Sequence, residues 1–140
     1  MTSHTNDQTI EAVIIAAQAA IKKGVTKVQN APVYATDVNV MIPTAMAYTD
    51  NGKSTVQSGG YILTWFDLII SVIVPKGNQE SSIHWILGIP QSVANVFRDD
   101  PTISGSCQTF EGDVTWHYIN DVANNLVGYE FNIHSIKIQG

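Results

Sequence analysis

The sequence predicts a single domain, residues 1–140, with an α/β fold of the α+β kind: a mixed or mainly antiparallel β-sheet flanked by an N-terminal helix and a second, kinked helix. Two observations lead to this class. Apolar residues recur at helical spacing in residues 10–21 and again in 83–97. Residues 61–74 and 114–138 are instead rich in β-branched and aromatic residues, many of them at period two. At 140 residues, the chain can bury a core without disulfides or metals.

Composition argues against several classes of protein. The formal net charge is −5 and only seven Lys and Arg residues are spread along the chain, whereas nucleic-acid binders gather basic residues on one face. Cys107 is the sole cysteine, which excludes an intrachain disulfide and a cysteine-based zinc site and fits a reducing, intracellular setting. The first seven residues are polar and lack the build of a signal peptide. We therefore expect no specific nucleic-acid binding and no secretion by that route.

Residues 10–24 form the first predicted helix. Thr5 and Gln8 can make a capping box before it, and two lysines in its last turn complement the helix dipole. Gly24 is placed to close the helix in the left-handed conformation. Because the apolar stripe is narrow, it predicts packing on a sheet and not a membrane anchor. The stripe consists of Ile10, Val13, Ile14, Ala17 and Ile21.

The apolar run 61–74 predicts a long buried strand. Its 14 residues, with Asp67 in the middle, fall short of the roughly 20 that a membrane-spanning helix needs. Pro75 and Gly77 end it. We expect the mixed face to be partly covered by a helix or by a neighbouring subunit. One face carries Ile62, Phe66, Leu68, Ile70, Val72 and Val74, interrupted by Thr64, and the mixed face carries Tyr61, Leu63, Trp65, Asp67, Ile69, Ser71 and Ile73.

The preceding residues, 25–60, have weaker patterns. Val25–Val28 predicts a short strand, and Val38–Ile42 predicts an alternating strand that Pro43 stops or places at an edge. Asp50-Asn51-Gly52-Lys53 is a hairpin-turn signal within a polar run, residues 49–60. This run is either a solvated hairpin tip, which we favour, or a projecting arm that docks on a partner.

The second helical region contains Gly88 and Pro90 between two short apolar stripes, which predicts a kinked helix or two helices in sequence. Asp100-Pro101 stops the helix, because a residue before proline is biased out of the helical conformation, and Gly105 permits a turn.

The last segment predicts a β-hairpin. Its first strand has Val114, Trp116 and Tyr118 on one face, and residues 120–125 make a polar connection to the returning strand. On that second strand the apolar positions change from odd to even numbers near His134-Ser135. Because strand side chains alternate at period two, this change predicts a β-bulge or a strand end that packs elsewhere.

No motif for catalysis or for a cofactor is present. The four histidines have no metal-binding spacing, and neither a nucleophile elbow nor a phosphate loop occurs. His117 and His134 can approach each other across the hairpin, but two histidines make a weak metal signal. Asp67 is the most anomalous carboxylate, since a buried charge needs a partner. We expect a non-enzymatic protein without cofactor or metal; a small enzyme with a site dispersed over Asp67, His117 and His134 is the less favoured alternative.

The order of these elements, together with one motif, resembles the tail-terminator proteins of tailed bacteriophages. The motif is the helix end Ile89-Pro90-Gln91-Ser92-Val93-Ala94-Asn95-Val96-Phe97-Arg98 followed by Asp99-Asp100-Pro101-Thr102-Ile103-Ser104-Gly105, with Tyr129-Glu130-Phe131-Asn132-Ile133 as the closing strand. The resemblance implies a hexameric ring that sits on the last ring of the tail tube, stops its polymerisation and presents a surface to the head's connector. It implies a virion protein of the head-proximal tail end, assembled in the host cytoplasm.

The resemblance makes the protein its own principal partner, together with the tail-tube protein and the head–tail connector or neck proteins. From the short apolar run 61–74 we expect no membrane contact. We expect residues 49–60 to form an inter-ring contact. Another neck, head-completion or tail-tube protein remains an alternative function. The candidate interaction residues are Asp50, Asn51, Lys53, Tyr61, Trp65 and Asp67.

Overall fold

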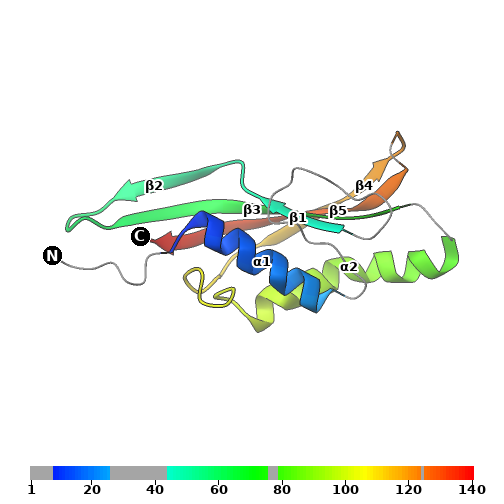
Figure 1. Ribbon diagram of the computed structural model, residues 1–140, viewed down its shortest axis with the longest axis horizontal. Coiled ribbons are helices and arrows are strands. Elements are labelled where there is room, and N and C mark those ends of the chain that lie inside the picture. The colour runs from blue at the N-terminus through cyan, green and yellow to red at the C-terminus, as the bar shows by residue number, and fades with distance from the viewer. Residues whose placement is uncertain (1–7, 26–43, 76–78, 124) are drawn as a thin grey trace.

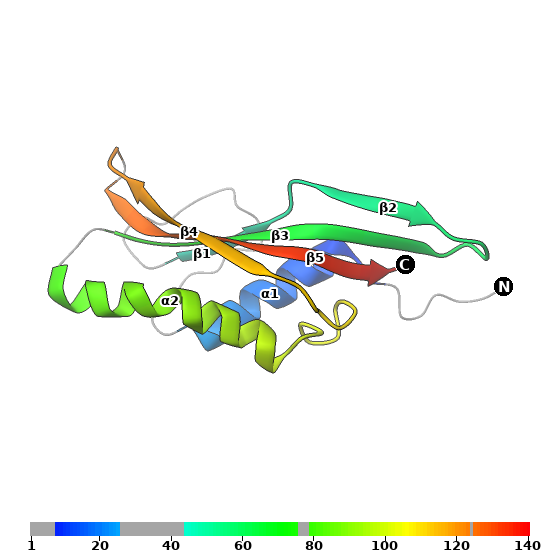
Figure 2. The same ribbon diagram turned by 180° about the vertical axis from the view of Figure 1, so that it is seen from behind.

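The computed structural model describes residues 8–25, 44–75, 79–123 and 125–140, which form two helices and one five-stranded antiparallel sheet (Figure 1). This arrangement confirms the α+β class. Both helices lie on the same face of the sheet, as the two opposite views show (Figures 1 and 2). The helices are α1 (Ile10–Gly24) and α2 (Gln79–Asp99); the strands are β1 (Thr44–Tyr48), β2 (Gly52–Val56), β3 (Ile62–Pro75), β4 (Val114–Asp121) and β5 (Leu126–Gln139).

Helix α1 buries the predicted stripe, with Val13, Ala17 and Ile21 fully covered. Its N-cap is Thr9, whose Oγ1 accepts the Ala12 N–H at 3.1 Å; the predicted cap residue Thr5 lies outside the described residues. The prediction that Gly24 closes the helix in the left-handed conformation is wrong. Gly24 is the last helical residue without a positive φ, and the Val25 N–H bonds to the Ile21 carbonyl at 2.8 Å.

Glycine is required at position 24 because a side chain would not fit there, and not because the backbone has a positive φ. A Cβ at this position would lie 2.5 Å from Cγ2 of Val96 on α2, so the two helices come close at a position where α1 has no side chain.

Helix α2 is one helix that runs through Pro90, so the alternative of two successive helices is wrong. Ile89, Val93 and Phe97 turn toward the sheet and are buried. The helix ends at Asp99, which confirms the predicted stop at Asp100-Pro101. Neither α1 nor α2 is long and apolar enough to cross a membrane.

The turn after α2 contains three successive residues with positive φ: Ile103, Ser104 and Gly105, at 47°, 58° and 78°. Gly105 behaves as predicted. Ile103 and Ser104 keep a positive φ for two reasons. The Asp100 carboxylate accepts the Ser104 N–H at 2.8 Å, and the Ile103 side chain is buried in the core.

The sheet has the order β1-β3-β5-β4, and β2 also pairs with β3. Strands β1 and β2 lie end to end along one edge of β3, since β1 is opposite Ile69–Ile73 and β2 is opposite Ile62–Phe66. The prediction of a hairpin turn at Asp50-Asn51-Gly52-Lys53 is therefore wrong. These residues link two consecutive edge strands, and the reversal of the chain occurs later, at residues 57–61.

The predicted bulge in the last strand is confirmed. Phe66 pairs with Ile136 and Leu68 with Ile133, so two residues of β5 lie opposite the single residue Asp67 of β3. Ser135 takes a φ of 59° there. The extra residue restores the apolar positions of β5 to the helix-covered face.

The core lies between the helices and one face of the sheet. The predicted apolar face of β3 is buried from Phe66 to Val74, and β5 contributes residues on both sides of its bulge. The β4–β5 hairpin is paired as predicted, whereas β1 was not predicted. The proposed strand Val38–Ile42 and most of Val25–Val28 lie outside the described residues. The fully or nearly buried members are Val13, Ala17, Ile21, Phe66, Leu68, Ile70, Val72, Ile89, Val93, Phe97, Phe131, Ile133 and Ile136.

Candidate functional site

The feature with the strongest bearing on function is a long extension of the sheet, which we call the arm: residues 52–66 and 136–140. It consists of β2, the turn, the first part of β3 and the end of β5. The turn is closed by the Gln57 N–H on the Tyr61 carbonyl at 2.7 Å and contains Gly59 and Gly60 at positive φ. The β2–β3 hairpin projects beyond the helix layer along the long axis of the molecule (Figures 1 and 2).

The end of the arm carries an exposed apolar pair. Val56 and Ile62 are direct neighbours across β2 and β3, and they are 78% and 43% exposed. They lie on the same face as Phe66, but the helices do not reach this far. Side chains on one face of a strand recur at every second residue, so Ile62 lies two such steps from Phe66. Phe66 is covered by the helices and buried, whereas Ile62 is not. This exposed apolar pair at the end of a projection is a candidate contact with another molecule.

The opposite face of the arm brings together a tryptophan and two lysines. The Nζ of Lys53 lies 5.0 Å from the ring centroid of Trp65, and the Nζ of Lys137 lies 5.7 Å from it. Both distances are in the range of cation–π contacts. Of the predicted interaction residues, Lys53 and Trp65 are thus adjacent. Lys137 was missed, because only the bulge in β5 places it opposite Trp65.

The arm is one positively charged part of an acidic protein, and the end of α1, with Lys22 and Lys23, is another. The arm contains Lys53 and Lys137 and no Asp or Glu, while the whole chain has a net charge of −5. This division of charge favours contact between the arm and an acidic surface.

Where the arm joins the rest of the sheet, Asp67 holds the bulge together. Its Oδ1 accepts the Ser135 N–H at 3.0 Å, and its backbone carbonyl accepts the Thr49 hydroxyl at 2.7 Å. The Asp67 N–H in turn bonds to the Asn51 carbonyl at 3.3 Å. The Asp67 carboxylate, which was expected to need a partner, therefore has one in the backbone N–H of Ser135. These hydrogen bonds join β3, β5 and the link between β1 and β2 at the base of the arm.

His134 extends this polar cluster toward β4. Its Nε2 lies 2.8 Å from the Thr115 hydroxyl, and its Nδ1 lies 3.6 Å from Oδ2 of Asp67, beyond hydrogen-bond length. His117 does not join the cluster; it lies opposite Glu130, with Nε2 and Oε1 3.8 Å apart. The structure thus brings together two of the three residues of the dispersed site and separates the third. The described residues contain no group of three His, Cys, Asp or Glu able to hold a metal.

The remaining predicted residues are near the arm without forming one site. Asp50 and Asn51 lie in the link between β1 and β2, where the Asn51 side-chain amide donates to Oδ1 of Asp50 at 2.6 Å. Tyr61 follows the turn at the end of the arm. The six candidates therefore follow the arm from its base to its end.

We expect Asp67→Ala to lower the free energy of unfolding by about 1–3 kcal/mol, because the Ser135 N–H in the bulge loses its acceptor. Asp67→Asn keeps an acceptor oxygen and should lose less. Urea unfolding followed by circular dichroism measures both values. The control Asp50→Ala removes an exposed carboxylate and should stay within about 0.5 kcal/mol. Equal losses in Asp67→Asn and Asp67→Ala would contradict this role of the hydrogen bond.

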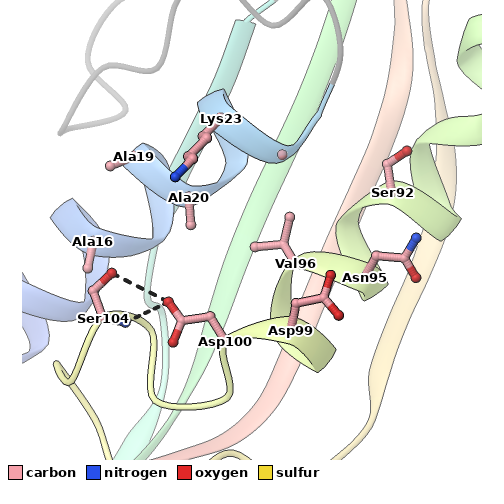
Figure 3. A pocket seen from close by; sticks show the side chains of 11 residues that line it. Ala16, Ala19, Ala20, Lys23, Ser92, Asn95, Val96, Asp99, Asp100 and Ser104 are labelled. Atoms are coloured by element: carbon pink, nitrogen blue, oxygen red, sulfur yellow. Dashed lines mark hydrogen bonds between the residues drawn. The ribbon is translucent and has the colours of Figure 1, made fainter.

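A cleft of about 590 Å³ separates α1 from the end of α2 (Figure 3). Ala16 and Ala20 contribute small side chains from α1, and Val96 faces them from α2. The cleft exists because the helices meet at Gly24 and Val96, while alanines leave space along the rest of α1. Its other lining residues are Ala19, Lys23, Gly24, Ser92, Asn95, Asp99, Asp100 and Ser104.

No protein-family model matches this chain, and no curated protein matches it significantly in sequence.

Proposed function

We propose that the protein is a structural component that associates head to tail into a closed ring, as the tail terminator of a bacteriophage does. The observation that carries this proposal is the apolar end of the arm, where Val56 is 78% exposed on a hairpin that extends past the helix layer. A projection of this kind contributes little to the fold of its own chain. Its exposed side chains are explained by burial against another molecule.

A ring requires two different surfaces that fit each other, because a heterologous contact repeated around an axis closes into a ring. The arm supplies one such surface. It differs in shape and charge from the rest of the molecule, so it is poorly suited to pair with itself. This favours a cyclic arrangement over a two-fold dimer.

The outer strand β4 gives further support. It forms one edge of the sheet among the described strands, and Trp116 and Tyr118 on it are each 53% exposed. An edge strand with exposed aromatic side chains is prone to associate with another chain. Burial of the β4 edge within the ring prevents its association with other chains.

In this role the protein forms a ring of about six copies at the head-proximal end of the tail, between the tail tube and the connector or neck proteins. It acts without catalysis, cofactor or metal, and it neither enters membranes nor binds nucleic acid specifically. Residues 49–60 contact a neighbouring molecule. A neck, head-completion or tail-tube protein is the alternative within the same structural class.

Light scattering coupled to size-exclusion chromatography tests the proposal. At high protein concentration we expect a species of about six times the 15.2 kDa mass of the chain, and on addition of the tail-tube protein a heavier species that contains both proteins. Electron microscopy should show closed rings. Open-ended tubes would favour a tail-tube protein, and a monomer under both conditions would contradict the proposal.

A further inference from the structure

We propose that Asn51 is a site of spontaneous modification, at which the backbone nitrogen of Gly52 displaces the side-chain amide and an aspartyl or isoaspartyl residue is formed. This reaction meets least hindrance where glycine follows asparagine, because glycine has no side chain beside the attacking nitrogen. Asn51-Gly52 is the one Asn-Gly pair of the sequence. The reaction requires a single chain and water, so it takes place whether or not the protein forms a ring.

The Asn51 side chain is accessible and lies outside regular structure. It belongs to the link between β1 and β2, in which Asp50 and Gly52 are exposed as well. Its amide nitrogen donates to Oδ1 of the neighbouring Asp50 at 2.6 Å, and no other described element binds this side chain. Attack on its carbonyl carbon, Cγ, therefore breaks no tertiary contact of the side chain.

The attacking nitrogen is not engaged in the pairing of β2 with β3. Gly52 lies opposite Phe66, and the Asp67 N–H bonds to the Asn51 carbonyl at 3.3 Å. In an antiparallel sheet, a bond of this kind between the flanking residues marks the opposed pair as one that exchanges no hydrogen bond. The Gly52 N–H therefore points to the open side of β2 among the described strands, and its proton can leave without the loss of a strand hydrogen bond.

Glycine at position 52 is required by packing. A Cβ there would lie 2.8 Å from the Trp65 carbonyl oxygen and 3.0 Å from Cβ of Phe66. These atoms belong to or adjoin the backbone of β3 and cannot turn aside as the end of a flexible side chain can. A bulkier residue, which would slow the attack, is therefore disfavoured by the close approach of β2 to β3.

The chemistry balances without an oxidant, a reductant or a cofactor. The Gly52 nitrogen loses its proton to base and forms a bond to Cγ of Asn51, and the Cγ–Nδ2 bond breaks as ammonia leaves with a proton from water. Water then opens the resulting succinimide ring at either carbonyl. Opening at Cγ gives aspartate with the original backbone. Opening at the main-chain carbonyl gives isoaspartate, whose backbone runs through Cβ and Cγ.

The isoaspartyl product alters the base of the arm. The main-chain carbonyl of Asn51 accepts both the Asp67 N–H and the Thr49 hydroxyl, each at 3.3 Å. In isoaspartate this carbonyl becomes a free carboxylate, and the backbone leading into β2 is longer by one methylene. We therefore expect the start of β2 to lose its fixed position on β3, and a new negative charge to lie beside Asp50.

Peptide mapping by mass spectrometry tests the proposal on the folded full chain, kept dilute in mildly alkaline buffer. Asn120 is the internal control, because it is also exposed but lies within β4 and is followed by Asp121. Conversion of Asn51 should be about tenfold or more faster than that of Asn120, since only Asn51 is followed by a residue without a side chain. It should slow in mildly acidic buffer, where the attacking nitrogen keeps its proton.

Equal rates at Asn51 and Asn120 in the folded chain would overturn the proposal. Rapid conversion of Asn51 in urea alone would also overturn it, because the fold would then hold the amide away from the Gly52 nitrogen. The variant Asn51→Gln should remain unmodified under the same conditions, since its longer side chain has to close a larger ring.

Amide hydrogen exchange measures the effect on the arm. The Asp67 N–H should exchange faster in aged protein that carries isoaspartate than in fresh protein, because its acceptor has been lost. Asn51→Asp is the matched control: it has the side chain of the other product but keeps the main-chain carbonyl, so exchange at Asp67 should match that of fresh protein. Unchanged exchange in protein that carries isoaspartate would contradict the predicted change at the base of the arm.

Discussion

Gly128→Ala is expected to prevent stable folding, at a cost of more than about 4 kcal/mol. Gly128 lies in β5 opposite Ile73, and a Cβ at this position would overlap the backbone carbonyl oxygen of Val72. Backbone atoms of the central strand cannot move aside without breaking the pairing of β3 with β5. This pairing is the centre of the sheet, so the loss should affect the whole domain.

Circular dichroism and urea unfolding of Gly128→Ala measure this effect, with Gly88→Ala as the matched control. At Gly88, within α2, a Cβ would meet no atom within 4 Å. Alanine is the better helix former there and should stabilise the protein by up to about 1 kcal/mol. A Gly128→Ala protein that unfolds at the urea concentration of the wild type would show that β3 and β5 are paired differently.

Phe131→Ala is expected to lower the free energy of unfolding by about 3–5 kcal/mol. Phe131 on β5 is fully buried beneath the helices and is the largest of the fully buried side chains in the described part of the chain. Its removal leaves a cavity in the core between the sheet and the helix layer. Phe131→Leu retains most of the apolar contact and should lose distinctly less. Urea unfolding gives both values.

Trp116→Ala provides the comparison for Phe131→Ala. Trp116 lies directly opposite Phe131 on the neighbouring strand β4 but is 53% exposed, with its ring edge-on to Tyr129 at 5.5 Å. Its removal should cost much less than that of Phe131. Equal losses would indicate that the core extends to the outer strand, and would weaken the assignment of β4 to an assembly surface.

The sequence was sufficient for the elements whose apolar patterns are strong. The stripe of α1, the long strand β3 and the β4–β5 hairpin are confirmed, because burial of one face leaves a period in the sequence. The bulge at His134-Ser135 could also be predicted, since a strand that changes phase must insert a residue to keep its apolar side chains on one face.

The sequence was insufficient for the edge of the sheet. Strands β1 and β2 are short, and β2 is largely exposed, so no apolar period marks them. The signal Asp50-Asn51-Gly52-Lys53 has the composition of a hairpin turn but lies between two strands that both pair with β3. Only pairing with a distant strand distinguishes a turn from an interruption in an edge, and turn residues are favourable in both.

The candidate site could likewise be predicted from the sequence only in part. The polar run and the anomalous Asp67 identified the arm and its base from local composition. The partners of these residues came from elsewhere: Lys137 beside Trp65, Ser135 bonded to Asp67, and Val96 close to Gly24. Each of these contacts joins residues more than 60 positions apart and depends on strand register or on helix crossing.

The sequence by itself determined which segments bury an apolar face, where the last strand changes phase and which residues lie near the base of the arm. It did so because local burial imposes a period and because glycine, proline and charged residues restrict the backbone nearby. The tertiary structure alone decided that residues 52–56 of the polar run form an edge strand paired with β3 and that the chain reverses at residues 57–61. It also decided that an apolar pair remains uncovered at the end of this hairpin while a cleft remains open between the helices, since both features depend on how far the helix layer extends along the sheet.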